Sequence, residues 1–528
     1  PYRLDVMLQG FRAYAQTGIV LQVGATPTIN VALGLGGLEE TVSVEASAPL
    51  VDVRSAGISE VVEQERILEL PLQGRQVTDL IVLAGAAVQT GAPGNRHFQG
   101  GVNISVAGGQ SFGVAYVLDG AMHNDPQNNA SLPLPFPDAL QEFRVATSGL
   151  SAENGMHSGA SVNAVTKSGT NRLSGTVFEF MRHHSLNATN RFAAVGPDGT
   201  RADDGLKRHQ FGGTLGGRIV RDRLFFFGAY QGTAVRQRPA ANLAYVPNAA
   251  MLAGDYSTFA SPACNSGRQI ALRAPFVNNR VSPTLFSPAA VKLAGMLPKT
   301  DNPCGEIRFT TSADENQRQV VTKIDWQRTA NHSVFGRYMA TIHKVDPAAL
   351  SQPGNILAAA SSGLDNSATS IAIGDTRVLS SNTVNSFRIT FNNTTVDRYN
   401  VHVVDGPDLG AKVYSYEPGH MRLNVDSGFS LGQDSGYGLA DNDAYQLSND
   451  VTLVRRSHQL SLGASVAYWH SEQYTCARCG GDWQFNGQTT GLGLADFLLG
   501  RASSLEHGGP GGLIFDQRYL GLFAQDTW

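Results

Sequence analysis

The sequence is poor in charge and has no long apolar run. Only 16% of its 528 residues are Asp, Glu, Lys or Arg, against about 25% in average proteins. The net charge is -4 and no Lys- and Arg-rich run is present, so the composition argues against nucleic-acid binding. The longest mostly apolar run, Leu80 to Val88, is far shorter than the roughly 20 residues that a membrane-spanning helix needs. Such a chain can cross a membrane only as a closed β-barrel, which pairs every backbone polar group.

The sequence also lacks the motifs of common enzyme and cofactor sites. It contains no GxSxG, HExxH, phosphate-binding loop or dinucleotide fingerprint, and its histidines have no evident triad or ligand partners. Asp434, Asp441, Asn442 and Asp443 form an acidic, glycine-rich stretch, but its spacing is not that of a calcium-binding loop. Solvated surface carboxylates explain that stretch better. We therefore predict a protein that is not an enzyme and has no cofactor or metal site.

Cysteine is scarce, with four residues in the chain. Cys476 and Cys479 form a CxxC pair in an expected long loop, and Cys264 and Cys304 share another. A redox role for CxxC needs a βαβ setting that is missing, and a metal site needs further ligands, for which only His470 and Asp482 are near. In an oxidising envelope, disulfides are the favoured interpretation. The pairing stays open.

Glycine, in contrast, is abundant, and the chain beyond residue 170 has the pattern of β-hairpins. Short turns join the expected strands 209–220 and 224–231, 320–328 and 333–343, 370–378 and 383–395, and 445–454 and 459–469. The connections between these hairpins, about 232–317, 344–368 and 396–444, are much longer. Loops beyond about 12–15 residues are rare in compact soluble domains. Short turns that alternate with long loops are typical of outer-membrane barrels.

The alternation of side chains supports the same interpretation. One face of strand 320–328 carries Val320, Thr322, Ile324 and Trp326, and the other carries Lys323, Asp325 and Gln327. An apolar lipid-facing side and a polar lumen side have this pattern. A soluble sandwich would show it too, so the loop asymmetry decides between the two.

The first third of the chain has a different organisation. Residues 1–38 predict short strands at 2–8, 19–23 and 28–33, as in the remnant of a β-sandwich, and residues 39–56 predict a linker. Residues 57–168 predict an α+β domain with helices near 63–70 and 77–88 and strands at 104–106, 115–118 and 142–145. Residues 169–528 then predict the first part of a barrel. Pro1 and Trp528 both look like cut ends.

Several motifs, in consistent order, resemble those of TonB-dependent outer-membrane receptors, specifically the Oar-like group with a carboxypeptidase-regulatory-like domain before the plug. The matching segments are Leu70-Pro71-Leu72-Gln73-Gly74-Arg75, Val117-Leu118-Asp119-Gly120, the stretch from Gly155 to Asn171, the run from Arg221 to Gly228, and three segments at 482–487, 495–500 and 522–528 that resemble later strands. The resemblance implies a mainly β fold with an N-terminal α+β plug. It implies a transmembrane antiparallel barrel of 22 strands, of which this chain supplies about half.

The resemblance also implies two sites. A TonB-box-like segment lies at 40–46, and TonB binding is assigned to Glu40, Thr41, Val42, Ser43 and Val44. An extended segment there can add a strand to TonB, although Glu45 departs from the usual small hydroxyl residue and a plain linker strand is the alternative. In the polar loop 119–129, the residues assigned to solute contact are His123, Asn124, Asp125 and Asn128, although hydrogen-bonded packing of a solvated loop on the barrel wall is the favoured interpretation for any single residue. Asp119-Gly120 itself predicts a turn.

The implied function is TonB-dependent active transport of a scarce or bulky solute across the bacterial outer membrane. The implied partners are TonB with its inner-membrane energising complex, outer-membrane lipid, and a small or oligomeric solute. The carbohydrate-binding-like accessory domain favours glycan-derived solutes, while iron chelates and peptides stay open. The alternatives are a non-transporting adhesin or glycan-binding surface protein of the outer membrane, and a soluble secreted glycan-binding protein.

Overall fold

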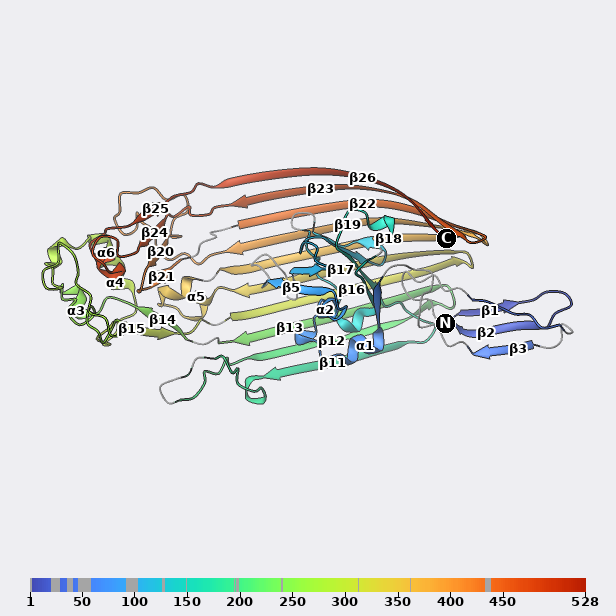
Figure 1. Ribbon diagram of the computed structural model, residues 1–528, viewed down its shortest axis with the longest axis horizontal. Helices are drawn as coiled ribbons and strands as arrows, with labels where there is room; N and C mark the ends of the chain where they lie inside the picture. The colour runs from blue at the N-terminus through green and yellow to red at the C-terminus, as the bar shows by residue number, and fades with distance from the viewer. Residues whose placement is uncertain are drawn as a thin grey trace.

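The computed structural model describes residues 2–19, 29–35, 41–45, 58–91, 103–125, 129–148, 150–193, 195, 199–238, 241–311, 313–360, 362–432 and 438–528. A large curved sheet runs along the molecule and partly surrounds a smaller α+β domain (Figure 1). A small sheet near the N-terminus lies at one end, and a group of folded loops lies at the other.

The large sheet has ten strands, and neighbouring strands are antiparallel throughout. The strands are β11 (Ser174–His183), β12 (Lys207–Val220), β13 (Leu224–Gln237), β16 (Ala313–Thr329), β17 (His332–Asp346), β18 (Gly363–Ser380), β19 (Thr383–Tyr399), β22 (Gly438–Arg455), β23 (His458–Thr475) and β26 (Gly511–Thr527). The edges are β11 and β26, so the sheet does not close on itself. The predicted hairpins are confirmed, and several strands extend further into the long connections than expected.

Side chains alternate across this sheet as the sequence predicts. On β16, Ile324 and Trp326 are 52% and 45% exposed on the outer face, whereas Lys323 is buried on the inner face. The outer face is apolar because it meets lipid, and the inner face contacts the α+β domain. Short turns join the strands at one end and long connections join them at the other (Figure 1). In barrels of this kind, the short-turn end is periplasmic and the long-loop end is extracellular.

The α+β domain, here called the plug, contains the sheet β4-β9-β10-β7-β8. Its elements are β4 (Ser59–Glu63), α1 (Gln64–Glu69), η1 (Gln73–Arg75), α2 (Asp79–Leu83), β5 (Ala87–Gly91), β6 (Asn103–Val106), β7 (Val114–Leu118), β8 (Ala121–Met122), η2 (Pro137–Ala139), β9 (Leu140–Ala146), η3 (Ala152–Asn154) and β10 (Ala160–Thr166). Helix α2 is shorter than the predicted 77–88 because Gly85 adopts a positive φ of 75° and β5 follows. The plug core includes Val321 and Met339 of the barrel wall, so plug and wall share one apolar interior.

The N-terminal sheet agrees only in part with the strands that the sequence predicts. It contains β1 (Tyr2–Val6), β2 (Ala13–Ile19) and β3 (Thr41–Glu45), in the order β1-β2-β3. Apart from Ile19, strand β2 lies where the sequence predicted no strand, and residues 20–23 of the expected strand 19–23 lie outside the described residues. Residues 29–33, most of the expected strand 28–33, form no strand in this sheet. Strand β3 pairs in parallel with β2, from Ala13 opposite Thr41 to Thr17 opposite Glu45. Part of the expected linker is thus a strand.

The long connections fold together into a domain at the extracellular end, here called the cap. Its elements are β14 (Asn242–Tyr245), α3 (Ala249–Leu252), η5 (Pro283–Leu285), α4 (Pro288–Met296), β15 (Glu306–Phe309), β20 (Arg422–Val425), β21 (Ser430–Leu431), β24 (Asp482–Phe485), α6 (Gly493–Leu498) and β25 (Ser504–Glu506), and η4 (His184–Leu186), α5 (Ala348–Ser351) and η6 (Ile356–Ala360) lie in neighbouring connections. Buried residues such as Tyr256, Leu293, Leu357, Leu423 and Phe497 build one core from four connections. The segments 482–487 and 495–500, expected as barrel strands, belong to this cap instead. No helix in the described part of the chain is long and apolar enough to cross a bilayer.

Candidate functional site

The plug meets the barrel wall at a buried charged group built around Asp119. Asp119 and Gly120 form the two-residue turn between β7 and β8, with φ of 54° and 79°, as a tight hairpin turn requires. A Cβ atom at position 120 would lie 3.2 Å from Nε of Arg388 in β19, so glycine allows the close approach to the wall. The predicted turn at this position is confirmed, and it carries a contact that the sequence interpretation did not include.

Two cations of the wall face the Asp119 carboxylate. Oδ1 lies 3.3 Å from Nζ of Lys323 in β16, and Oδ2 lies 3.3 Å from Nε of Arg337 in β17. The three side chains are only 2%, 7% and 0% exposed, in that order. The backbone amide of Thr166 donates to the same carboxylate at 3.0 Å, and its hydroxyl donates at 2.9 Å. Here this set is called the Asp119 latch.

Opposing effects set the charge of Asp119. Burial raises the pKa of Asp119. Lys323, Arg337 and the hydrogen bonds from Thr166 together lower this pKa by more than burial raises it, so the net shift is downward. The carboxylate is therefore ionised at neutral pH. A buried charge of this kind needs its partners, because isolated ions are costly to take out of water.

Other contacts attach the plug to several strands of the wall. Arg75 forms an ion pair with Asp138 within the plug, and its guanidinium lies 3.8 Å from the ring centre of Phe180 in β11. The Gln319 side chain of β16 accepts a hydrogen bond from the Phe136 amide at 2.9 Å. Further contacts join Met122 to Gln446 and Asn392, and the Ala152 amide to Gln525. The plug is thus attached to strands from one edge of the sheet to the other.

The residues assigned to solute contact lie inside the plug. His123, Asn124 and Asp125 are 0%, 2% and 8% exposed. The His123 ring bonds the Pro133 carbonyl at 2.9 Å, and the Asn124 amide bonds the backbone of Val114 and Tyr116. Asn128 lies outside the described residues. Solute contact at these positions stays a prediction. The hydrogen bonds of His123 and Asn124 given above join them to other residues of the plug.

The TonB-box-like segment lies at the short-turn end (Figure 1). Thr41, Val42, Ser43 and Val44 belong to β3, at the edge of the N-terminal sheet, and Glu40 lies outside the described residues. The four cysteines all lie in the cap: disulfides join Cys264 to Cys304 and Cys476 to Cys479.

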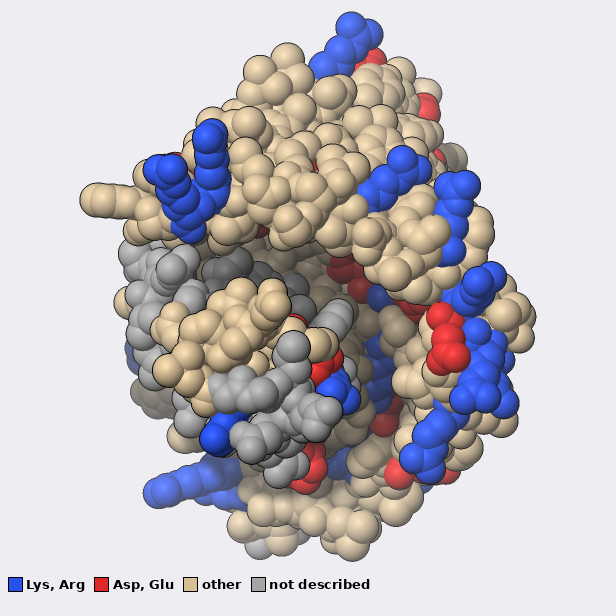
Figure 2. Space-filling view, turned by 90° about the vertical axis from the view of Figure 1, so that its right-hand side faces the viewer, with Lys and Arg blue, Asp and Glu red and all other residues tan. Residues whose placement is uncertain are grey.

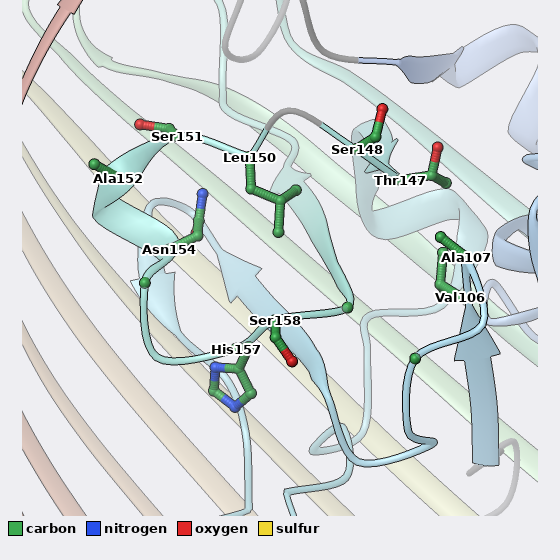
Figure 3. Close-up of a pocket in the computed structure, with 13 residues that line it drawn as sticks. Val106, Ala107, Thr147, Ser148, Leu150, Ser151, Ala152, Asn154, His157 and Ser158 are labelled. Carbon is green, nitrogen blue, oxygen red and sulfur yellow. The ribbon is translucent and has the colours of Figure 1, made fainter.

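The plug also contains a cavity of about 540 Å³ beside η3. Its lining mixes apolar residues and glycines with the polar side chains of Thr147, Ser148, Ser151, Asn154, His157 and Ser158 (Figure 3). Burial lowers the pKa of His157, which favours the neutral ring. None of the residues that the sequence assigned to a site lines this cavity.

The sequence interpretation missed Lys323, Arg337 and Thr166. Its only signal was the placement of Lys323 on the polar face of an expected strand. Contact with Asp119 depends on how the plug is oriented in the lumen, because the two residues lie 204 positions apart. Side-chain alternation does not carry that information.

An apolar outer wall, a polar inner face and a folded plug behind short turns together define a plugged β-barrel protein of the bacterial outer membrane. A sequence family described as the outer membrane beta barrel domain matches residues 165–528, and the chain belongs to that family. The TonB-dependent transporter Oar of Myxococcus xanthus is 31% identical over 236 residues, which cover 43% of this chain and 22% of that protein.

A solved structure with a TM-score above 0.5 shows the same fold at low sequence identity. The outer membrane transporter YddB from Escherichia coli aligns with a TM-score of 0.53 and 12% identity, over 89% of this chain and 55% of that chain. The siderophore receptor PirA from Acinetobacter baumannii aligns with a TM-score of 0.45 and 12% identity, over 79% of this chain and 48% of that chain. The chain therefore spans about half of the solved proteins and about a fifth of Oar.

Proposed function

We propose that this chain is part of a TonB-dependent transporter that carries a scarce or bulky solute across the outer membrane. The observation that supports this most is the Asp119 latch. A buried ion pair contributes less net stability than apolar packing of the same volume, and its Coulomb attraction weakens as the charges separate. Such an attachment holds a plug in one position and still lets it leave the wall when it is pulled.

Energy for this movement must come from outside the solute site. A solute that binds the closed and open plug equally well shifts no equilibrium between them. In the proposal, the segment from Glu40 to Val44 pairs with TonB as an added strand, and the pull of TonB on this segment supplies the bias. The support is that Thr41–Glu45 is an edge strand at the short-turn end and precedes β4, the first strand of the plug, in the sequence.

For the solute, we propose a glycan-derived molecule that is first captured by the cap. Tyr414 and Tyr416 are 66% and 49% exposed, and their ring centres lie 4.7 Å apart. The His507 ring lies 5.5 Å from Tyr416. The backbone amide of Tyr416 and the ring of His507 both form hydrogen bonds to the carbonyl oxygen of Cys479. Exposed aromatic faces fixed in this way are suited to stack on the apolar C–H faces of sugar rings, at a small entropic cost.

The second candidate is an adhesin or glycan-binding surface protein that does not transport. One observation favours it: the cap has a core of its own and two disulfides, as an independent binding domain would.

Binding of TonB and energised uptake separate the two candidates. The full-length receptor should bind the C-terminal domain of the host's TonB, and Val44→Pro should abolish binding because proline removes a strand donor. Uptake of fluorescent oligosaccharides by cells should stop when a protonophore is added. Binding that proline leaves unchanged, or capture without energised uptake, would favour the adhesin.

The cap variants test the solute class. Tyr414→Ala with Tyr416→Ala should reduce oligosaccharide capture about tenfold or more, since each lost ring contact is worth about 1 kcal/mol or more. Phe192→Ala, at an aromatic that is 91% exposed in another long connection, is the matched control and should leave capture unchanged. Equal loss in both variants would contradict a specific aromatic site.

A further inference from the structure

Five exposed arginines lie at the short-turn end of the barrel wall, and are here called the arginine rim. They are Arg221 and Arg223 in the β12–β13 turn, Arg328 near the end of β16, Arg455 at the end of β22 and Arg456 in the turn that follows it. Figure 2 views the molecule from this end and shows Lys and Arg side chains spaced around its outline, with fewer acidic ones.

The arginine rim begins where the apolar outer face stops. Val220 and Val454 are 48% and 45% exposed and directly precede Arg221 and Arg455. Trp326 is 45% exposed, and the Arg328 guanidinium lies 5.9 Å from the centre of its ring. Tryptophan marks the membrane–water interface in barrels, and long cationic side chains extend from there toward the headgroups. The arginines are therefore at headgroup depth.

Most arginines of the rim form no ion pair with another described residue of the chain. Among the described residues, no carboxylate forms an ion pair with Arg223, Arg328, Arg455 or Arg456. Arg221 faces Asp222 at 3.5 Å, but that carboxylate also accepts a hydrogen bond from the Asn171 amide at 2.5 Å. A guanidinium has donors only, in a planar fork that matches phosphate oxygens.

The opposite end of the same wall also carries exposed carboxylates, but two of them are paired. Asp365 and Asp516 have 46% and 56% of their side chains exposed near the long-loop ends of β18 and β26, and Asp441 and Glu472 are exposed on β22 and β23. The paired carboxylates are Asp365, with Lys344 at 3.2 Å, and Asp516, with His470 at 2.9 Å. Four of the five rim arginines, in contrast, form no ion pair within the described residues.

From this placement we propose that the arginine rim binds the phosphate headgroups of anionic phospholipids in the periplasmic leaflet. The basic side chains lie just beyond an apolar band, which is the arrangement that attracts anionic lipid. The lipid neutralises the rim and fixes the depth of the wall in the membrane. This inference depends on the barrel in its membrane and not on transport.

The test uses the full-length protein in zwitterionic detergent micelles doped with phosphatidylglycerol or phosphatidylcholine, with bound lipid counted by native mass spectrometry. The variant R221Q/R223Q/R455Q/R456Q should lose phosphatidylglycerol affinity about tenfold or more, because each basic residue near a membrane surface adds to the attraction. Phosphatidylcholine binding should not change. Added salt should weaken phosphatidylglycerol binding by the unmodified protein more than binding by the variant.

A matched control removes four exposed arginines from the long-loop end: R201Q/R268Q/R280Q/R308Q. It should bind phosphatidylglycerol as the unmodified protein does, and heat-modifiable gel mobility confirms that both variants fold. Equal phosphatidylglycerol binding by the rim variant would overturn the proposal. So would rim-dependent binding of peptidoglycan fragments without any preference for anionic lipid.

Discussion

Oδ1 of Asp119, in the plug turn between β7 and β8, lies 3.3 Å from Nζ of Lys323 in barrel strand β16. The two groups are 2% and 7% exposed, so neither is solvated well enough to stand alone. The latch therefore ties the position of the turn to that of the wall. Displacing the turn would break it unless water or another ion entered.

Asp119→Asn should loosen the plug without unfolding the wall. The substitution removes the only carboxylate that faces both Lys323 and Arg337 among the described ion pairs, and breaking a buried pair from one side costs about 3–5 kcal/mol. Hydrogen exchange followed by mass spectrometry should show faster exchange in β7 and β10, while peptides of β18 and β19 keep their rates.

Two further variants make this prediction specific. Glu60→Gln alters an exposed plug carboxylate that lies 3.6 Å from Arg66, and it should leave the exchange of β7 unchanged. Asp119→Asn with Lys323→Gln should recover part of the lost protection, because the second change removes one of the uncompensated charges. Additive effects of the two substitutions would show that the residues do not act as a pair.

His123 should make the plug less stable in mild acid. Its pKa is about 3, chiefly because of burial, with Arg337 lowering it further, whereas the unfolded chain has the ordinary value near 6.5. Between these values the unfolded plug binds a proton that the folded plug does not. Stability therefore falls as the pH falls through this window, by about 1.4 kcal/mol per pH unit.

Comparing pH 6.5 with pH 4 isolates this effect from the latch. The pKa of Asp119 lies below its ordinary value of 3.8, so its stabilising charge is retained above pH 4. We expect the urea midpoint of the plug, followed by hydrogen exchange at β8, to drop between these pH values. His123→Gln keeps a donor for the Pro133 carbonyl and should flatten the slope. A slope of equal size in the variant would assign it to other groups, such as His157.

How much of this could be read from the sequence depends on how local the signal is. Ile324 and Trp326 alternate with Lys323, so the two faces of β16 follow from a spacing of two residues. The turn at Asp119-Gly120 is equally local. The contact between Asp119 and Lys323 depends on the docking of two domains, which no local spacing records.

The cap shows the same limit from another side. Asp496 and Phe497 lie in a segment that was expected to be a barrel strand, yet they form part of helix α6. Asp496 accepts hydrogen bonds from the Thr489 and Thr490 amides, at 3.0 and 2.8 Å, and Phe497 packs in the cap core. The four connections that build this core are separated in the sequence by pairs of barrel strands, so a search for short strands treats each of them as an isolated loop.

The two disulfides should contribute unequally to the stability of the cap. Cys264 and Cys304 are 40 residues apart, whereas Cys476 and Cys479 are only three apart. In the chain-entropy account a loop of this larger size is worth roughly 3–4 kcal/mol, and a very short loop less. The variant C264S/C304S should therefore be cut by protease in 242–309 much faster than the unmodified cap. C476S/C479S is the control variant. If it were cleaved faster than C264S/C304S, the loop-length argument would be contradicted.

Gly169 should be the most sensitive glycine at the junction between plug and barrel. A Cβ atom there would lie 2.2 Å from the Phe226 carbonyl oxygen and 2.5 Å from the Gly217 carbonyl oxygen. Both obstacles are backbone atoms of paired strands, so they cannot rotate away as a side chain would. Gly169→Ala should therefore separate the junction from β12 and β13, with a loss of about 1–3 kcal/mol or more.

Gly228→Ala is the matched control for this prediction. Gly228 lies in β13 only two residues from Phe226, and a Cβ atom there would meet nothing within 4 Å. The same change from glycine to alanine, made in a strand that Gly169 contacts, should thus leave the heat-modified mobility transition in place, while Gly169→Ala lowers its midpoint temperature by several degrees. If both variants lowered the midpoint equally, the cause would be the loss of glycine itself. If only Gly169→Ala does, close backbone contact at the exit of the plug limits the stability of the junction.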